Sequence, residues 1–221
     1  MLIRPVRILI ISFLVMLVGC SEKSSPQLAG DDVFFITVST PSVDTRTVMG
    51  VKNDDRYPLY WENCDRISLN GYLSGELTGV DTEKAVVRFN IVGYPSAPYT
   101  VLYPGKENQT GSVTFQQHQT YRKGSVASGS LPMAGYSETL ETVSLEPIGA
   151  VLQLPLTGAT AVRGILTRAV AGEPLSGEYD LETKSVKAPD TGGFVWLDAS
   201  SAVTLSSTPE LFQISIPAGD R

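Results

Sequence analysis

The sequence predicts an all-β protein that is built as two β-sandwich domains in tandem. Short segments of alternating apolar and polar residues follow one another along most of the chain, and each is bounded by glycine or proline. The 20 glycines and 14 prolines leave few uninterrupted windows that are long enough for a helix. Because no strand–helix–strand alternation is present, sandwiches are expected rather than a parallel sheet.

The chain begins with the features of a bacterial lipoprotein signal. Arg4 and Arg7 precede an apolar run that ends, after two small residues, at Cys20. The run is too short to span a bilayer as a helix. We therefore expect residues 1–20 to be a signal peptide with a lipobox, and Cys20 to carry the lipid that anchors the protein in the membrane. The alternative is an uncleaved signal anchor in which Cys20 is incidental.

The composition excludes several classes of protein. The formal net charge is -6, so nucleic acid is not an expected partner. With 42% hydrophobic and 18% charged residues, the chain is expected to form a core rather than to be disordered. Cys64 is the only cysteine besides Cys20, so the fold is not expected to be held by disulfides. We expect Cys64 to be a small buried residue in or beside a turn.

The first strand of the exported part is predicted directly after a polar spacer. Residues 21–32 have no periodicity and are expected to be a flexible spacer. The next segment, 33–40, places Phe34, Ile36 and Val38 on one face and polar residues opposite, which is typical of a half-buried strand. The polar segment that follows it is expected to be an exposed loop.

The rest of the N-terminal domain, 33–146, is expected to contain further short strands. Residues 61–69 predict strand, Asn/Asp turn and strand, with Ile67 and Leu69 facing inward. Residues 121–135 are expected to be a long connection, and 138–146 fits either a short helix or a strand. The other strands of this domain are predicted at 85–91, 99–103 and 113–117.

A second β-sandwich is expected from residue 147 to residue 221. Beyond Pro147 the alternation restarts at 151–156, where leucines alternate with other residues. Its further strands are predicted at 161–168, 175–179, 194–197, 202–205 and 211–216.

The sequence predicts no catalytic residue, no metal site and no cofactor, so an enzyme is not expected. The only histidine, His118, lies among glutamines and is expected to be a solvated surface residue. No serine lies in a Gly-x-Ser-x-Gly motif. The acidic pair Asp54 and Asp55 is expected to be solvated, because no loop has the spacing of a dedicated calcium site.

Several short motifs follow one another along most of the chain. They are the lipobox at Cys20, Thr45-Arg46-Thr47 after the first strand, Trp61 followed by Asp65 and Ile67, Tyr99 to Pro104, Gln119 to Tyr121, Leu131 to Gly135, and Phe212 to Asp220. In this combination the chain resembles the Bacteroides-type fimbrillin family, lipoproteins that polymerise into surface fimbriae. The resemblance implies two transthyretin-like β-sandwich domains and a fimbrial subunit at the outer membrane and cell surface.

The chain departs from the family pattern at two places. The family usually has a glycine before the aspartate of the tryptophan turn, where this chain has Cys64. Family members also commonly continue past residues 217–220 with further strands. The second domain is therefore expected to be incomplete at its C-terminus, which would leave an unpaired strand edge.

The resemblance also implies a mechanism of assembly. In the family, an arginine in the loop after the first strand is cut after export, which removes the lipid-bearing strand. Transferred to this chain, cleavage between Arg46 and Thr47 would remove Phe34, Ile36 and Val38 from the domain. A strand of a neighbouring subunit would then fill the groove, in a homopolymer or a heteropolymer.

A different class of function is also compatible with the sequence. In this alternative the protein is a surface lipoprotein that does not polymerise and that binds glycans or other host or bacterial surface ligands through its loops. Arg46 is then only a solvated loop charge, and aromatic residues such as Tyr57, Tyr60 and Tyr94 are candidates for stacking on sugars. A glycan site of this kind predicts a concave patch of parallel aromatic rings with amide or acid neighbours.

Overall fold

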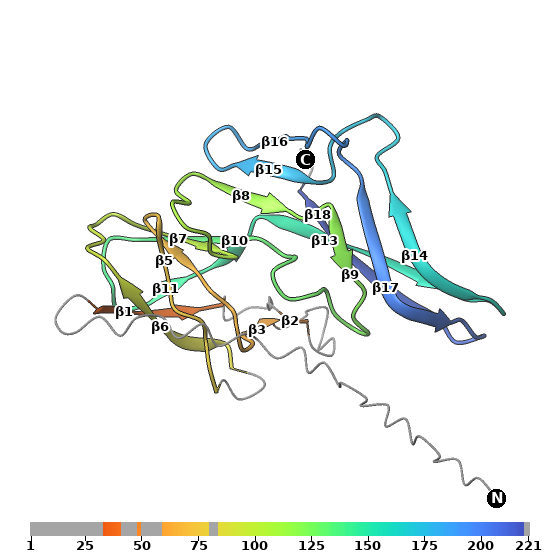
Figure 1. The fold of residues 1–221 in the computed structure, drawn as a ribbon, viewed down its shortest axis with the longest axis horizontal. Helices are drawn as coiled ribbons and strands as arrows, with labels where there is room; N and C mark the ends of the chain where they lie inside the picture. Colours follow the sequence, from red (N-terminus) through yellow and green to blue (C-terminus); the bar gives the residue numbers. More distant parts are fainter. Residues whose placement is uncertain (1–32, 41–47, 50–58, 80–83, 219–221) are drawn as a thin grey trace, which may run out of the picture.

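The computed structural model describes residues 33–40, 48–49, 59–79 and 84–218. These residues form strands, turns and irregular segments, and no helix is present among them. The predicted all-β class is therefore confirmed. Figure 1 shows the strands gathered in several short sheets, with β1 and β6 toward one end of the long axis and β14 and β17 toward the other.

The first sandwich consists of two sheets that share one core. Its smaller sheet has the order β11 (Val143–Ser144), β1 (Val33–Ser39) and β6 (Val86–Val92). Its larger sheet has the order β12 (Glu146–Pro147), β10 (Met133–Ser137), β7 (Tyr99–Tyr103), β4 (Ser68–Leu69) and β5 (Tyr72–Leu73). Apolar side chains of both sheets pack together around Trp61. A short hairpin of β2 (Val48–Met49) and β3 (Leu59–Tyr60) adjoins this unit in the chain.

The second half contributes a separate core between two further sheets. β13 (Gly149–Leu156) pairs with β18 (Glu210–Pro217) along its whole length. The facing sheet has the order β14 (Ala161–Thr167), β17 (Val195–Thr204) and β9 (His118–Thr120). A third sheet, β16 (Ser185–Lys187), β15 (Gly177–Asp180) and β8 (Ser112–Phe115), covers a smaller apolar cluster that includes Leu102 and Ala134 of the first sandwich.

Two strands depart from the predicted division near Glu146. β8 and β9 precede that residue in the chain, yet β8 pairs with β15 and β9 pairs in parallel with β17. The short step between them, through Gln116 and Gln117, carries the chain from one sheet to another. The sheets therefore combine strands from both halves of the sequence. This pairing was not predicted, because alternation along a strand indicates its buried face but not its partner strand.

Three individual predictions change in the structure. Residues 133–135 were expected to be part of a connection, but they belong to β10, which lies between β7 and β12 in the larger sheet. The two strands predicted at 194–197 and 202–205 are one strand, β17. The segment 138–146, which fitted helix or strand, begins with a bend, contains β11 and ends at the first residue of β12.

Candidate functional site

β1 lies in the middle of its sheet. It pairs antiparallel with β6 along all 7 of its residues, and Val38 and Ser39 pair in parallel with β11 on the other side. Beyond this ladder the Leu145 amide donates to the Ser39 carbonyl oxygen at 2.8 Å. A chain without β1 would have a groove with unpaired backbone groups along the whole of β6 on one side and, on the other side, at the two residues of β11 and at Leu145.

The inward side chains of β1 belong to the core of the first sandwich. Ile36 and Val38 are fully buried, and Phe34 is half-buried against the same core. Phe89 and Ile91 of β6 are also buried there. The alternation predicted these three side chains of β1 to point inward, so the interpretation of 33–40 as a half-buried strand is confirmed.

The end of β1 is linked to the core tryptophan through one carbonyl group. The Ala85 carbonyl oxygen accepts hydrogen bonds from the Thr40 amide at 3.0 Å, the Thr40 hydroxyl at 3.3 Å and Nε1 of Trp61 at 3.2 Å. Trp61 makes edge contacts with Phe89 and Tyr103, at centroid distances of 5.1 and 5.4 Å. Loss of β1 together with Thr40 would therefore remove two of these three donors to the Ala85 carbonyl oxygen, which also binds the Trp61 ring.

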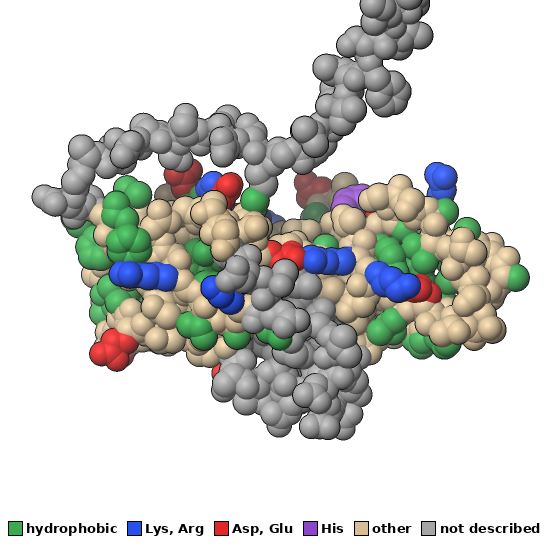
Figure 2. All heavy atoms as spheres, turned by 90° about the horizontal axis from the view of Figure 1, so that it is seen from below, with side chains coloured by type: hydrophobic (Ala, Val, Ile, Leu, Met, Phe, Trp, Pro, Cys, Tyr) green, Lys and Arg blue, Asp and Glu red, His purple; other side chains and the backbone are tan. Residues whose placement is uncertain are grey.

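The outward face of β1 and β6 carries exposed apolar side chains beside polar ones. Val33 and Phe35 of β1 and Val86 and Val92 of β6 are each 45% to 54% exposed, and the Arg88 guanidinium lies 4.2 Å from the centroid of the Phe35 ring. Figure 2 looks from below in the orientation of Figure 1, and it shows apolar and basic side chains gathered at this end. Because β1 supplies two of these four apolar side chains, a strand that replaced β1 would change the character of this patch.

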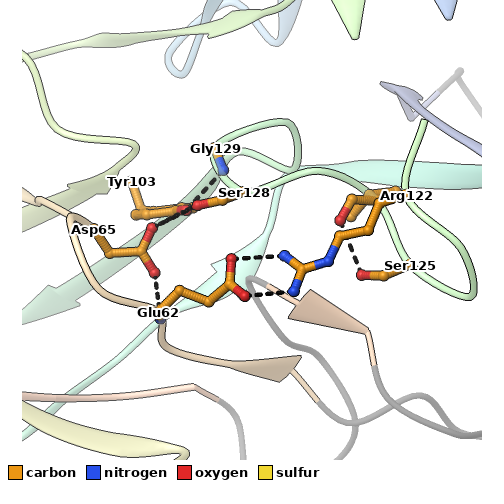
Figure 3. Close-up of polar contacts among 8 residues, drawn as sticks. Glu62, Asp65, Tyr103, Arg122, Ser125, Ser128 and Gly129 are labelled. Carbon is orange, nitrogen blue, oxygen red and sulfur yellow. Dashed lines mark hydrogen bonds and ion pairs between the residues drawn. The ribbon is translucent and has the colours of Figure 1, made fainter. Parts of the chain in front are cut away.

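The turn after Trp61 carries a buried carboxylate with three donors. Asp65 accepts hydrogen bonds from the Tyr103 hydroxyl at 2.7 Å, the Ser128 hydroxyl at 2.8 Å and the Glu62 amide at 2.8 Å (Figure 3). The Tyr103 oxygen in turn accepts from the Gly129 amide at 2.8 Å. Burial, followed by the charge of Asp65, raises the pKa of Tyr103 well above its ordinary value, so the phenol keeps its proton.

An ion pair fastens the same turn to the connection between β9 and β10. The Arg122 guanidinium donates two hydrogen bonds to the Glu62 carboxylate, at 2.7 and 2.6 Å (Figure 3). The hydrogen bond to Glu62 raises the pKa of Arg122, which is charged in any case. Together with Ser128 and Gly129, Arg122 holds this connection against the tryptophan turn of the first sandwich.

Cys64 lies at a left-handed backbone position in this turn. Its φ is 69° and its side chain is exposed, so the prediction of a turn residue is confirmed and the prediction of burial is wrong. Its amide donates to the Leu77 carbonyl oxygen at 2.9 Å. Glycine is the residue that adopts this conformation at least cost, in agreement with the glycine that the resemblance led us to expect there.

The predicted residues of lipidation and cleavage lie outside the described part of the chain. Cys20, Arg46 and Thr47 are not described, so the signal peptide, the spacer at 21–32 and the cleavage site stay predictions. The same holds for Asp54, Asp55 and Tyr57. In the described ranges, no group of three or more His, Cys, Asp or Glu side chains could hold a metal ion.

The aromatic residues named for the glycan alternative do not form one patch. Tyr94 is 66% exposed, but it packs against the edge of Phe34 at a centroid distance of 6.2 Å. Tyr60 is half-buried in β3. His118 is exposed on β9, as expected.

A groove of about 850 Å³ lies between β10 and β12 of the first sandwich and the β15–β16 hairpin. Its lining includes Tyr136, Glu146, Tyr179 and Lys184. Tyr136 is 66% exposed, whereas Tyr179 is almost fully buried and packs against Phe115. The groove therefore offers one accessible ring, because its second ring, Tyr179, is buried.

No family model, curated protein or solved structure matches this chain. Nor does the described part of the chain include a helix with the length and apolar character needed to cross a membrane.

Sequence reasoning missed the polar network around Asp65. Tyr103 lies 38 residues beyond Asp65, and Ser128 lies 63 residues beyond it. A buried aspartate one turn after a core tryptophan is the only local signal, because nothing in the intervening sequence identifies its hydrogen-bond partners.

Proposed function

We propose that this protein is a structural subunit or adhesin of a bacterial surface fimbrium, exported as an outer-membrane lipoprotein precursor. Assembly proceeds by strand exchange after a protease removes β1. The partners are other subunits of the same or a related kind, with the membrane as partner of the lipid-anchored precursor. The proposal rests on the resemblance of the sequence and on one structural observation, the central position of β1.

The central position of β1 is the observation that carries the mechanism. A strand at the edge of a sheet can be lost without opening the core, but β1 has β6 on one side and β11 on the other. Its loss opens a groove that accepts main-chain hydrogen bonds along β6 and, at one end, from β11, and that accepts apolar side chains at alternate positions. A donor strand with apolar residues at the positions of Phe34, Ile36 and Val38 would match it.

The energies favour filling the groove over leaving it open. Burial of the three inward side chains of β1 contributes on the order of 5 kcal/mol before the cost of ordering the donor strand. The Ala85 carbonyl and the Trp61 ring lie at the end of this groove, so a donor that also supplies a threonine at the position of Thr40 would restore the lost donors. The precursor fills its own groove and is expected to stay monomeric until it is cut.

The experiment is controlled cleavage of the purified chain that begins after the signal. An arginine-specific protease is expected to produce a new N-terminus at Thr47, followed by polymers in negative-stain images. The Arg46→Ala variant is the matched control, and it is expected to stay uncut at this position and monomeric. A chain that begins at Thr47 and remains monomeric at high concentration would contradict the strand-exchange mechanism.

Lipidation is tested independently of polymerisation. The Cys20→Ala variant is expected to leave the membrane fraction, while the wild type incorporates labelled fatty acid. Sedimentation of the variant with membranes, together with no label in the wild type, would exclude Cys20 as the anchor.

A further inference from the structure

The outward face of the β14–β17–β9 sheet carries an aromatic strip that the fimbrial proposal does not use. The strand register places Leu166, Trp196 and His118 in one row across the three strands. The next row contains Gly164, Asp198 and Thr120. Leu166 is 48% and Trp196 is 36% exposed, and the polar side chains of both rows are exposed as well.

Gly164 lets the Trp196 ring lie down on the sheet. A Cβ at Gly164 would collide with three consecutive atoms of the six-membered part of the indole ring. Glycine at this position therefore leaves the space in which the indole rests against the backbone of β14. One side of the ring is supported by the sheet, and the residue is still 36% exposed. Such a supported ring is a rigid stacking platform, because little side-chain entropy remains to be lost on binding.

The strip continues into a small cavity at the start of β17. Phe194 lies two residues before Trp196, and the Arg168 guanidinium lies 5.3 Å from the centroid of its ring. Together with Glu173, Thr191 and the backbone of Gly192 and Gly193, they line a cavity of about 210 Å³.

The wall of this cavity is held in place by a glutamine of the neighbouring segment. The Gln117 side chain accepts a hydrogen bond from the Thr191 hydroxyl at 2.8 Å and donates one to the Gly192 carbonyl oxygen. The Gln117 carbonyl oxygen also accepts from the Trp196 amide at 2.7 Å. One residue thus connects the loop of the cavity to the strand of the platform, so both are fixed relative to each other.

We propose that this strip binds a neutral carbohydrate chain, with one sugar ring stacked on Trp196 and a neighbouring sugar in the cavity beside Phe194. A pyranose ring has an apolar C–H face that packs on an aromatic plane, and hydroxyl groups around its rim that need donors and acceptors. Asp198, Arg168 and Glu173 supply these groups beside the two rings. The site lies far along the chain from β1 and does not depend on strand exchange.

The charges of the strip favour a neutral sugar over other ligands that stack on aromatic rings. A nucleic acid would bring phosphates close to Asp198 and Glu173 on a chain whose net charge is -6. The Asp198 carboxylate makes no ion pair or side-chain hydrogen bond with any residue that the structure describes. It is therefore available as an acceptor for ligand hydroxyls. An acidic glycan meets the same repulsion as a nucleic acid.

Tryptophan fluorescence tests the proposal directly. The chain has 2 tryptophans, and Trp61 is 1% exposed, so acrylamide quenching of the folded protein reports mainly on Trp196. The probes are hexasaccharides of β-linked glucose, α-linked glucose, mannose and xylose, and oligomers of N-acetyllactosamine. At least one probe is expected to protect the fluorescence, with a dissociation constant below about 1 mM.

Variants then locate the binding, measured by calorimetry with the probe that protects. Trp196→Ala is expected to weaken binding by about tenfold or more, whereas Trp196→Phe keeps an aromatic face and stays within about threefold. Asp198→Ala leaves the platform in place and is expected to weaken binding by about threefold. Tyr136→Ala is the matched control, because Tyr136 is an exposed aromatic residue in a different groove.

Three outcomes would overturn the proposal. The first is that no probe protects the fluorescence or binds at about 10 mM. The second is that Tyr136→Ala abolishes binding while Trp196→Ala does not, which would place the sugar in the groove beside β10. The third is that a single-stranded DNA oligomer or a peptide protects Trp196 more strongly than every sugar.

Discussion

Tyr103 and Tyr121 each donate a hydrogen bond to a carboxylate, but the two pairs lie in different surroundings. Tyr103 donates to Asp65 at 2.7 Å in the first sandwich, and Tyr121 donates to Glu210 at 2.6 Å beside the core of the second. Asp65 is 4% exposed and has two further donors. The Glu210 side chain is 19% exposed, and its other neighbour, Lys123, is 81% exposed.

The comparison shows that hydrogen-bond length does not determine what a pair contributes. Burial raises the pKa of both tyrosines, and the carboxylate partner of each raises it further. The two pairs differ in what remains when one partner is removed. Around Asp65, the Tyr103 hydroxyl would be left in the protein interior, beside the less buried Glu62 amide and Ser128 hydroxyl, whereas water can reach the groups around Glu210.

The largest difference is expected when the carboxylates are removed. Asp65→Ala should lower the free energy of unfolding by about 3 kcal/mol, because the Tyr103 hydroxyl, the Ser128 hydroxyl and the Glu62 amide lose their acceptor. Glu210→Ala should cost less than about 1 kcal/mol. Urea denaturation of the three proteins measures both values. Equal costs would show that the burial of Asp65 has no energetic consequence.

Removal of the phenol oxygens is expected to have a smaller effect of the same sign. Tyr103→Phe should cost about 1.5 kcal/mol, since Asp65 loses one donor of three and the Gly129 amide loses its acceptor. Tyr121→Phe keeps the ring contact with Phe212 and should cost less than about 1 kcal/mol. A larger loss in Tyr121→Phe than in Tyr103→Phe would reverse the comparison.

Alkaline pH should reduce the advantage of Tyr103 over phenylalanine. The folded-state pKa of Tyr103 is raised above the unfolded value, so its contribution is complete below about pH 10 and is lost as the pH rises toward the folded-state pKa. Between about pH 9 and pH 11, the cost of Tyr103→Phe should fall by about 1 kcal/mol. Denaturation at both pH values measures it, and a cost that grows with pH would contradict the assignment.

Local patterns were enough to predict some elements of the fold. Phe34, Ile36 and Val38 alternate with polar or exposed residues, so β1 and its inward face can be predicted from one short segment. β10 was missed because it is buried on both faces: Met133 packs in the main core and Ala134 in the smaller cluster behind it. A strand of that kind has no alternation to detect.

The sites depend on strand register, which local patterns do not contain. Gly164 and Trp196 become neighbours only when β14 pairs with β17 in one register, so neither residue signals the platform by itself. Gln119 is similar, because its buried side chain binds the backbone of Ser215 across 96 residues of sequence. Such contacts follow from the topology, and the parallel pairing of β9 with β17 was not predictable from spacing.

The smallest expected effect concerns the backbone that presents Asp65. Cys64 has a positive φ, which costs an ordinary L-residue about 1 to 2 kcal/mol, whereas glycine adopts it freely. Glycine also has a greater conformational entropy in the unfolded chain, which lowers the free energy of unfolding by about 0.5 to 1 kcal/mol. Cys64→Gly should therefore raise the free energy of unfolding by about 0.5 kcal/mol without altering any side chain of the Asp65 network.

A glycine elsewhere provides the control for this prediction. Glu138 is exposed in a bend and does not have a positive φ, so Glu138→Gly adds the same unfolded-state entropy without relieving strain. It should lower the free energy of unfolding by about 0.5 kcal/mol, opposite in sign to Cys64→Gly. Urea denaturation under reducing conditions measures both variants and prevents thiol oxidation in the parent. If both variants are destabilised equally, the left-handed position of Cys64 carries no strain, and the turn is held by the bonds of Asp65 alone.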